Sequence, residues 1–242
     1  MAEPDVRPLT PADLDWVADL AGARRAALVE HAPRFWRPAA DAAARHRAFL
    51  GHLIADDATV GLRTDRGFVL AVPGRRRAVV DDWAVADPAA WAVDGVALLT
   101  ALREALPGEA WVRVVGAAAE TERLAAAAVV GLEPAEVWWH RDLPPTRVLG
   151  EPGAIGLSTP GTTGRLVPAP PVYDPGGPVL LVTATDSAEA LAAVETEAAR
   201  RGATVSVVSQ RPDDLGTELL LVGAGYTRTS VFLEPPAGPA PA

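Results

Sequence analysis

Two adjacent aspartates, Asp81 and Asp82, are the residues best suited to acid–base chemistry. They lie in residues 78–85, whose valine-rich pattern predicts a single β-strand. Because neighbouring strand residues point to opposite faces of a sheet, one carboxylate can face a cleft while the other faces helices or solvent. A carboxylate buried in a cleft has a raised pKa and can serve as general base toward an amine. The alternative is that the pair makes only structural hydrogen bonds at a strand end.

The histidines are weaker candidates. His140 lies beside Trp138 and Trp139, where it is either a proton shuttle or a structural residue packed beside aromatic rings. His46 and His52 are six residues apart, so they do not share a helix face for metal binding, and we predict no metal site. The chain has no cysteine, which excludes disulfides and cysteine nucleophiles. It also has no lysine, so a Walker-type phosphate loop is excluded.

The composition narrows the function classes further. The 242 residues include 31 acidic and 22 basic ones, giving a net charge of −9. Such a charge disfavours nucleic acid, whose phosphates require clustered cations. No stretch approaches the ~18 apolar residues of a membrane span, and the N-terminus lacks the apolar segment of a signal peptide. We therefore expect a cytoplasmic protein, typical of bacteria, that binds neither nucleic acid nor membranes.

Proline and glycine divide the chain unevenly. Residues 144–177 are rich in both and read as a linker, and residues 236–242 read as a tail. The linker separates a first unit, residues 1–143, from a second, residues 178–235. Hydrophobic periodicity predicts β-α-α-β-β-β-α-β-α-β for the first unit, with a helix over residues 94–106, and β-α-β-α-β for the second. The second order repeats the end of the first.

The first unit resembles the GNAT acetyltransferase superfamily. The segments that carry this resemblance are VRPLTPADLDWVADLA, AVVDDWAVADP, DGVALLTALREAL and AAAAVVGLEPAEVWW. The resemblance implies an α+β fold with a mixed sheet, followed here by a smaller half-domain that is also GNAT-like. It further implies two strands that splay apart to hold the pantetheine arm of acetyl-CoA. The pyrophosphate would bind backbone N–H groups at the start of the next helix, where the helix dipole favours anions.

The phosphate-binding motif of that superfamily, [RQ]-x-x-G-x-[GA], is degenerate here. Gly95 matches its last position, but Val93 and Ala90 stand where a glycine and an Arg or Gln are usual. Asp94 adds a negative charge beside the expected pyrophosphate, and residues 91–94 suit a hydrophobic plug with an acidic helix cap equally well. The residues that the resemblance assigns to acyl-CoA are Trp83, Ala84, Val85, Val93, Asp94, Gly95, Val96 and Ala97. A backbone N–H near Val85 would polarise the thioester carbonyl.

Two functions remain open. The first is an acetyl-CoA- or acyl-CoA-dependent N-acyltransferase for a small amine, with Asp81 or Asp82 as base. The penultimate helix lacks the tyrosine that many superfamily members use as general acid. The second is a catalytically inactive binding or scaffolding protein that has lost the phosphate loop. The half-domain would leave a sheet face or edge unpaired by itself, so we expect it to dock on the first unit or on another chain, which leaves a homodimer open.

Overall fold

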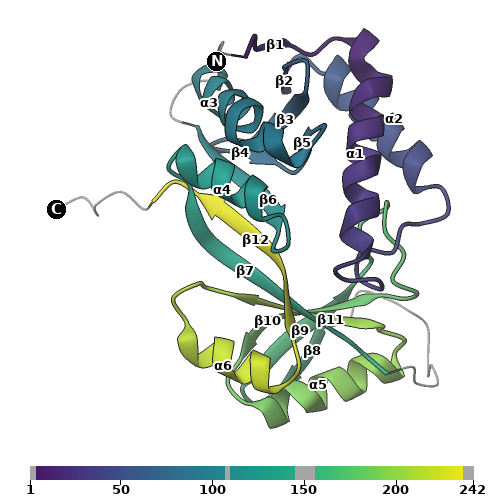
Figure 1. Ribbon diagram of the computed structural model, residues 1–242. Helices are drawn as coiled ribbons and strands as arrows, with labels where there is room; N and C mark the ends of the chain where they lie inside the picture. The colour runs from purple at the N-terminus through teal and green to yellow at the C-terminus, as the bar shows by residue number, and fades with distance from the viewer. Residues whose placement is uncertain (1–3, 107–109, 145–155, 237–242) are drawn as a thin grey trace. The chain divides into compact units, whose positions relative to one another are not determined.

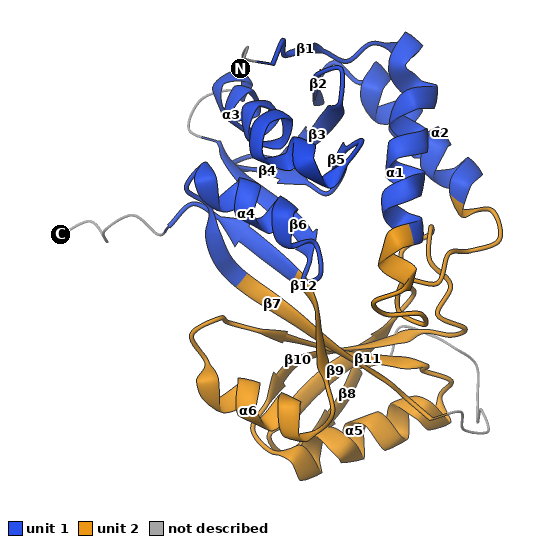
Figure 2. Ribbon diagram, viewed as in Figure 1, with its two compact units in different colours: residues 1–26, 43–135, 231–242 blue, residues 27–42, 136–230 orange. Residues whose placement is uncertain are grey.

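The computed structural model describes residues 4–106, 110–144 and 156–236, and it divides the chain into two compact units. Unit 1 comprises residues 1–26, 43–135 and 231–242, and unit 2 comprises residues 27–42 and 136–230 (Figure 2). This division differs from the predicted one. Residues 27–42 belong to unit 2, and the last strand returns to unit 1. The predicted linker, residues 144–177, contains two strands and is not a plain connection.

Unit 1 contains a sheet with helices on both faces (Figure 1). Its strands are β1 (Arg7–Pro8), β2 (Val60–Arg63), β3 (Gly67–Pro73), β4 (Arg77–Val80), β5 (Trp83–Val85) and β6 (Trp111–Ala117), joined by the end of β12 (Thr227–Glu234). Its helices are α1 (Leu14–Val29), α2 (Ala42–Ala55), α3 (Val96–Ala105) and α4 (Thr121–Val129); residues 27–29 of α1 and residue 42 of α2 fall in unit 2.

Strand β3 shows how the core of unit 1 forms, because every residue from Gly67 to Ala71 is buried. Val69 and Ala71 pack in the cluster that includes α3 and α4. Phe68 and Leu70 alternate with them and pack in the cluster that includes α1 and α2. The alternation follows from the two-residue period of a strand. A strand that is covered on both faces therefore reads as a continuous apolar run.

Unit 2 is built on parallel strands β10 (Val179–Thr185) and β11 (Val205–Gln210). Strands β9 (Thr162–Val167) and β8 (Gly156–Thr159) extend the β10 edge, and β7 (Glu133–Asp142) pairs with β11. Helices α5 (Ala188–Arg200) and α6 (Leu215–Gly223) contribute to the core cluster on one face. On the other face, Phe35 from residues 27–42 packs against Val179, Val205 and Val207. The predicted half-domain is thus completed by segments from elsewhere in the chain.

Strands β7 and β12 are each divided between the units. Residues 133–135 of β7 and 231–234 of β12 belong to unit 1, and the rest of both strands belongs to unit 2. Val231 and Leu233 lie in the core cluster of unit 1, whereas Val137 and Trp139 lie in that of unit 2. Each of these two strands therefore contributes residues to the core of one unit and continues along the chain into the other.

Two predicted elements differ from those observed. The strand expected over residues 78–85 is interrupted at Asp81 and Asp82, so that β4 and β5 are separate strands. The helix expected over residues 94–106 is preceded by a 3-10 turn, Pro88–Ala90, and one π-helical turn, Trp91–Gly95. Continuous helical winding from residue 88 removes the loop on which the predicted phosphate site depended.

Candidate functional site

In unit 1 two parallel strands separate at the position where the sequence predicts a cleft. Residues 77–80 of β4 pair with residues 111–114 of β6, and the registered pairing ends at Val80 and Val114. Beyond that point β5 pairs only with β3, and the Leu70 N–H donates to the Asp82 carbonyl. The interruption at Asp81 and Asp82 thus marks the point of separation. We call the space between β5 and the end of β6 the splay.

The guanidinium of Arg123, on α4, joins the two strands at the splay. One of its N–H groups, Nη2, donates to the Asp81 carbonyl at 2.9 Å and to the Val115 carbonyl at 2.6 Å. The side chain is fully buried, with 0 % of its surface exposed. Burial and the positive charge of Arg24 lower the pKa of Arg123 to about 10, so the group remains a cation at neutral pH.

Two tryptophans pack beside this guanidinium. The Trp83 and Trp91 rings meet edge to face with their centroids 4.7 Å apart, and Trp83 is fully buried. The Arg123 Cζ atom lies 5.5 Å from the centroid of the Trp83 ring, within the range of a cation–π interaction. Trp83 Nε1 and Arg123 Nε are buried and have no hydrogen-bond partner among the described residues. The wall of the splay is therefore made of large side chains in mutual contact.

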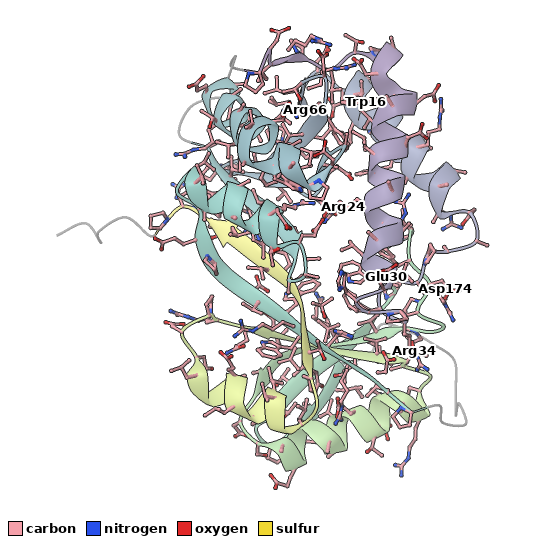
Figure 3. The ribbon with its side chains drawn as sticks, viewed as in Figure 1. Trp16, Arg24, Glu30, Arg34, Arg66 and Asp174 are labelled. Atoms are coloured by element: carbon pink, nitrogen blue, oxygen red, sulfur yellow. The ribbon has the colours of Figure 1, made fainter. Side chains whose placement is uncertain are left out.

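Glu120 supplies the countercharge for this buried arginine. It accepts two hydrogen bonds from Arg24, at 2.6 and 2.9 Å, and one from the Ala117 N–H at 2.8 Å. Arg24 extends from α1 and is labelled in Figure 3. Burial by itself would raise the pKa of Glu120, but the charges of Arg123 and Arg24 outweigh it and lower the pKa to about 2.

Replacing Glu120 with glutamine should change how stability depends on pH. A pKa lowered from 4.5 to about 2 stabilises the folded state above pH ~4.5, and this contribution is lost as the pH falls toward 2. We expect the wild type to lose about 2 kcal/mol more than Glu120→Gln over that range, measured by urea unfolding at several pH values. Glu122→Gln, exposed on the same helix, is the control and should behave as the wild type. Parallel pH profiles for Glu120→Gln and the wild type would contradict the assignment.

The two predicted catalytic aspartates have different surroundings. Asp82 is paired with His46, whose Nε2 lies 3.1 Å from Asp82 Oδ1, and Arg25 contacts the other nitrogen of the His46 ring. Asp81 is exposed, and its carboxylate accepts no hydrogen bond within the described ranges. Packed protein atoms raise the pKa of Asp81, against the opposing charge of Arg24. Because water still reaches this carboxylate, solvent offsets part of the penalty.

The predicted acyl-CoA residues do not form an anion site. Trp83, Ala84 and Val85 form β5, Val93, Asp94 and Gly95 end the π-helical turn, and Val96 and Ala97 begin α3. Asp94 is buried, with 3 % exposed, and its carboxylate accepts a hydrogen bond from Arg66 at 2.5 Å. A Cβ atom on Gly95 would lie 2.6 Å from Trp91. Asp94 therefore places a buried carboxylate, paired with Arg66, where the resemblance puts the pyrophosphate, and the helical winding that begins at residue 88 leaves no phosphate loop there.

Unit 2 also has two parallel strands, one of which is irregular, followed by a helix. Its parallel strands pair over residues 179–182 and 205–208, and β10 is irregular between Val182 and Ala184. The following helix, α5, caps its own start, because Ser187 Oγ accepts from the Ala190 N–H at 3.2 Å. The carboxylate of Asp186 lies against Gly161, leaving no room for a Cβ atom there. Unit 2 therefore offers no free helix start to a phosphate either.

His140 has a structural setting in unit 2. Its ring contacts the Thr229 hydroxyl and lies 5.4 Å from the ring of Phe35, centroid to centroid. Burial lowers the pKa of His140, which favours the neutral ring.

Within the described ranges no group of three His, Cys, Asp or Glu side chains could hold a metal ion. No helix in the same ranges is long and apolar enough to cross a membrane.

The sequence did not reveal the residues that fill the splay. Arg24, Arg25, His46, Glu120 and Arg123 read as ordinary helix residues. One signal was available for Arg123, which lies three and four residues before Ala126 and Ala127, both buried. An arginine on the apolar stripe of a helix needs polar partners inside the protein. The position of those partners depends on strands far away in the sequence.

Among known proteins, only solved structures are similar to this chain, and they share its fold. No protein-family model matches the sequence, and no curated protein matches it. Among solved structures, a protein from Thermoplasma acidophilum assigned as an acetyltransferase is 11 % identical, with a TM-score of 0.55, and the match covers 95 % of this chain and 98 % of that one. A GCN5-related N-acetyltransferase from Sphaerobacter thermophilus is 16 % identical, with a TM-score of 0.52, and the match covers 96 % of both chains.

These similarities extend over nearly the whole chain and concern its helix-covered mixed sheet. The predicted α+β class is confirmed. At such low identity the similarity concerns the fold and not the activity. The chain has the fold of the GNAT acetyltransferases.

Proposed function

We propose that this chain is a GNAT-fold binding protein that does not use acyl-CoA. The observation that carries the proposal is the fully buried Arg123, which bridges the carbonyls of Asp81 and Val115 in the splay. A pantetheine arm would need this space and these backbone groups. To enter, it would have to displace a cation that also lies 3.6 Å from Glu120.

The two helix starts support the same proposal. Anion binding at a helix start needs free N–H groups and no competing negative charge. In unit 1 the position is taken by Asp94, which is buried and paired with Arg66. In unit 2 it is taken by the Ser187 cap beside Asp186. The serine cap in unit 2 thus occupies one of the N–H groups that an external anion would need.

Isothermal titration with acetyl-CoA and with free coenzyme A tests the proposal. We expect no saturable heat up to 1 mM ligand, and a melting temperature that does not change with ligand. A ligand at 100 times its Kd would stabilise the protein by about 2.7 kcal/mol, which a thermal-shift measurement detects easily. Saturable binding of either compound within this range, up to 1 mM, would overturn the proposal.

The second candidate is the acyl-CoA-dependent N-acyltransferase acting on a small amine. It is favoured by the fold and by the exposed carboxylate of Asp81 at the strand interruption, where a base could meet an amine. Incubation with acetyl-CoA and a polyamine, followed by mass spectrometry of the amine, tests it. Acetylated product that disappears in Asp81→Asn but not in Glu122→Gln would support the transferase and exclude the binding-only proposal.

A further inference from the structure

The hairpin turn between β3 and β4 carries three consecutive arginines, Arg75, Arg76 and Arg77. All three are exposed, and their guanidinium groups have no carboxylate partner within the described ranges. The hairpin between β2 and β3 differs, because its arginines Arg63 and Arg66 both pair with aspartates. An acidic chain, with 31 acidic and 22 basic residues, thus leaves a cluster of unpaired cations at one place. We call Arg75, Arg76 and Arg77 the arginine turn.

The geometry of the hairpin does not explain arginine at these positions. The Gly74 N–H donates to the Arg77 carbonyl at 2.8 Å, which closes a loop of two residues, Arg75 and Arg76. Two-residue hairpin loops favour asparagine, aspartate and glycine at positive φ, but neither arginine has a positive φ. Adjacent like charges also repel one another. Arginine therefore has no advantage over a neutral residue in forming this loop.

Strand β6 holds the arginine turn in place. Arg77 begins β4 opposite Trp111, and the Trp111 N–H donates to the Arg76 carbonyl at 3.1 Å. The Arg77 Cζ atom lies 5.6 Å from the centroid of the Trp111 ring, a cation–π contact that uses none of the guanidinium N–H groups. A cation that is already positioned loses less conformational entropy when it binds a ligand. The turn therefore presents its hydrogen-bond donors from a fixed backbone.

The arginine turn favours linked phosphates over other anions. Guanidinium groups bind phosphate oxygens through paired hydrogen bonds. The three cations belong to consecutive residues, whose Cα atoms are ~3.8 Å apart. Linked phosphates carry charge on every unit of their chain, whereas carboxylates on one side of an extended acidic peptide are ~6.6 Å apart. A long nucleic acid would continue onto the remaining surface of a chain with a net charge of −9, which repels it.

We propose that the arginine turn binds an oligophosphate, a molecule with three or more linked phosphate groups. Strands β3 and β4 contain no acidic residue, and the nearest ones along the sequence are Asp65 and Asp81, so no carboxylate of either strand competes for the arginines. The site is separate from the splay, which lies beyond the opposite end of β4, at Val80. The inference therefore does not rest on whether the chain binds acyl-CoA.

Isothermal titration of the full-length protein with inorganic tripolyphosphate tests the proposal. At ~50 mM NaCl we expect one site with a Kd of ~100 µM or below. Because the contacts are ionic, raising the NaCl concentration to ~200 mM should weaken binding at least ~10-fold.

A double variant, Arg75→Gln with Arg76→Gln, locates the site. It should weaken binding at least ~10-fold and leave the circular dichroism spectrum unchanged, because both side chains are exposed. The matched control is Arg165→Gln with Arg211→Gln, which removes the same charge from exposed positions in unit 2. The control should change the Kd less than ~3-fold, since screening confines the effect of a distant exposed charge.

Four results would overturn the proposal. The first is no saturable heat with tripolyphosphate up to ~5 mM. The second is equal weakening in both double variants, which would show a response to net charge alone. The third is binding of hexaglutamate as tightly as tripolyphosphate, and the fourth is binding of ATP without binding of tripolyphosphate, which would assign recognition to the base. Coenzyme A binding that persists in the Arg75 and Arg76 double variant would overturn only the proposed function.

Discussion

Replacing Arg123 with alanine is expected to lower the free energy of unfolding by about 4 kcal/mol. The change removes both hydrogen bonds that the guanidinium makes across the splay, so the Val115 carbonyl loses this buried donor and the Asp81 carbonyl keeps only the longer bond from Arg24, at 3.4 Å. Each buried unpaired group costs about 1–3 kcal/mol, and the space left by a fully buried side chain adds to this. Release of a desolvated cation offsets part of the loss. Urea unfolding of wild type and variant at pH 7 measures the difference.

Two further variants separate the contributions. Arg123→Met retains most of the volume without the hydrogen bonds, and we expect it to recover about half of the loss. Arg103→Ala removes an exposed arginine on α3 that also donates to a backbone carbonyl, that of Val130. It should cost less than about 1 kcal/mol. An Arg123→Ala protein as stable as Arg103→Ala would show that the guanidinium does not hold the splay together.

Replacing Arg141 with alanine is expected to lower the free energy of unfolding by a similar amount, about 4 kcal/mol. Arg141 pairs with Glu195, which is only 3 % exposed, and its Nη1 donates to the Ala224 carbonyl at 2.8 Å. Without it the buried carboxylate of Glu195 keeps only the Tyr226 hydroxyl, which lies 2.5 Å away, as a partner among the described residues. Burial raises the pKa of Tyr226 to about 12, so this hydroxyl stays protonated and neutral and can only donate a hydrogen bond to the carboxylate.

An exposed pair in the same unit is the control for Arg141. Arg228 lies 2.5 Å from Glu218, and both side chains are in contact with solvent. Arg228→Ala should therefore cost no more than about 1 kcal/mol. The two variants remove the same chemical group from the same unit and differ in the burial of the partner carboxylate. Equal costs for both variants would show that Glu195 is hydrated in solution and would contradict the buried pair.

Local sequence patterns predicted most of the secondary structure. Alternation and helical spacing predicted β2, β3, β6, α1, α2 and α4 in their observed order, because these elements keep a regular apolar period. The interruption at Asp81 and Asp82 was not predicted. An interruption of two residues does not disturb the apolar periodicity of the surrounding segment. It becomes visible only in the structure, where β3 pairs with β4 and with β5 separately.

The candidate site was predicted less well than the fold. The resemblance to the GNAT superfamily implied a splay, and residue types at fixed spacing showed the degenerate phosphate motif with its acidic residue Asp94. It gave no reason to place Arg123 inside the protein. An arginine in an alanine-rich helix is normally a surface residue, and its burial depends on carbonyls at Asp81 and Val115 that only the folded sheet brings within reach.

The sequence by itself determined most of the helices and strands of the two predicted units, the acidic charge and the lack of a complete phosphate motif. The tertiary structure decided which segments complete each unit. Residues 27–42 cover a sheet face in unit 2, and β7 and β12 each contribute to both units. Pairing between strands nearly 100 residues apart follows from burial and hydrogen bonding in the folded chain. The apolar periodicity of a strand does not predict this pairing, since the periodicity is the same whichever neighbouring strand it pairs with.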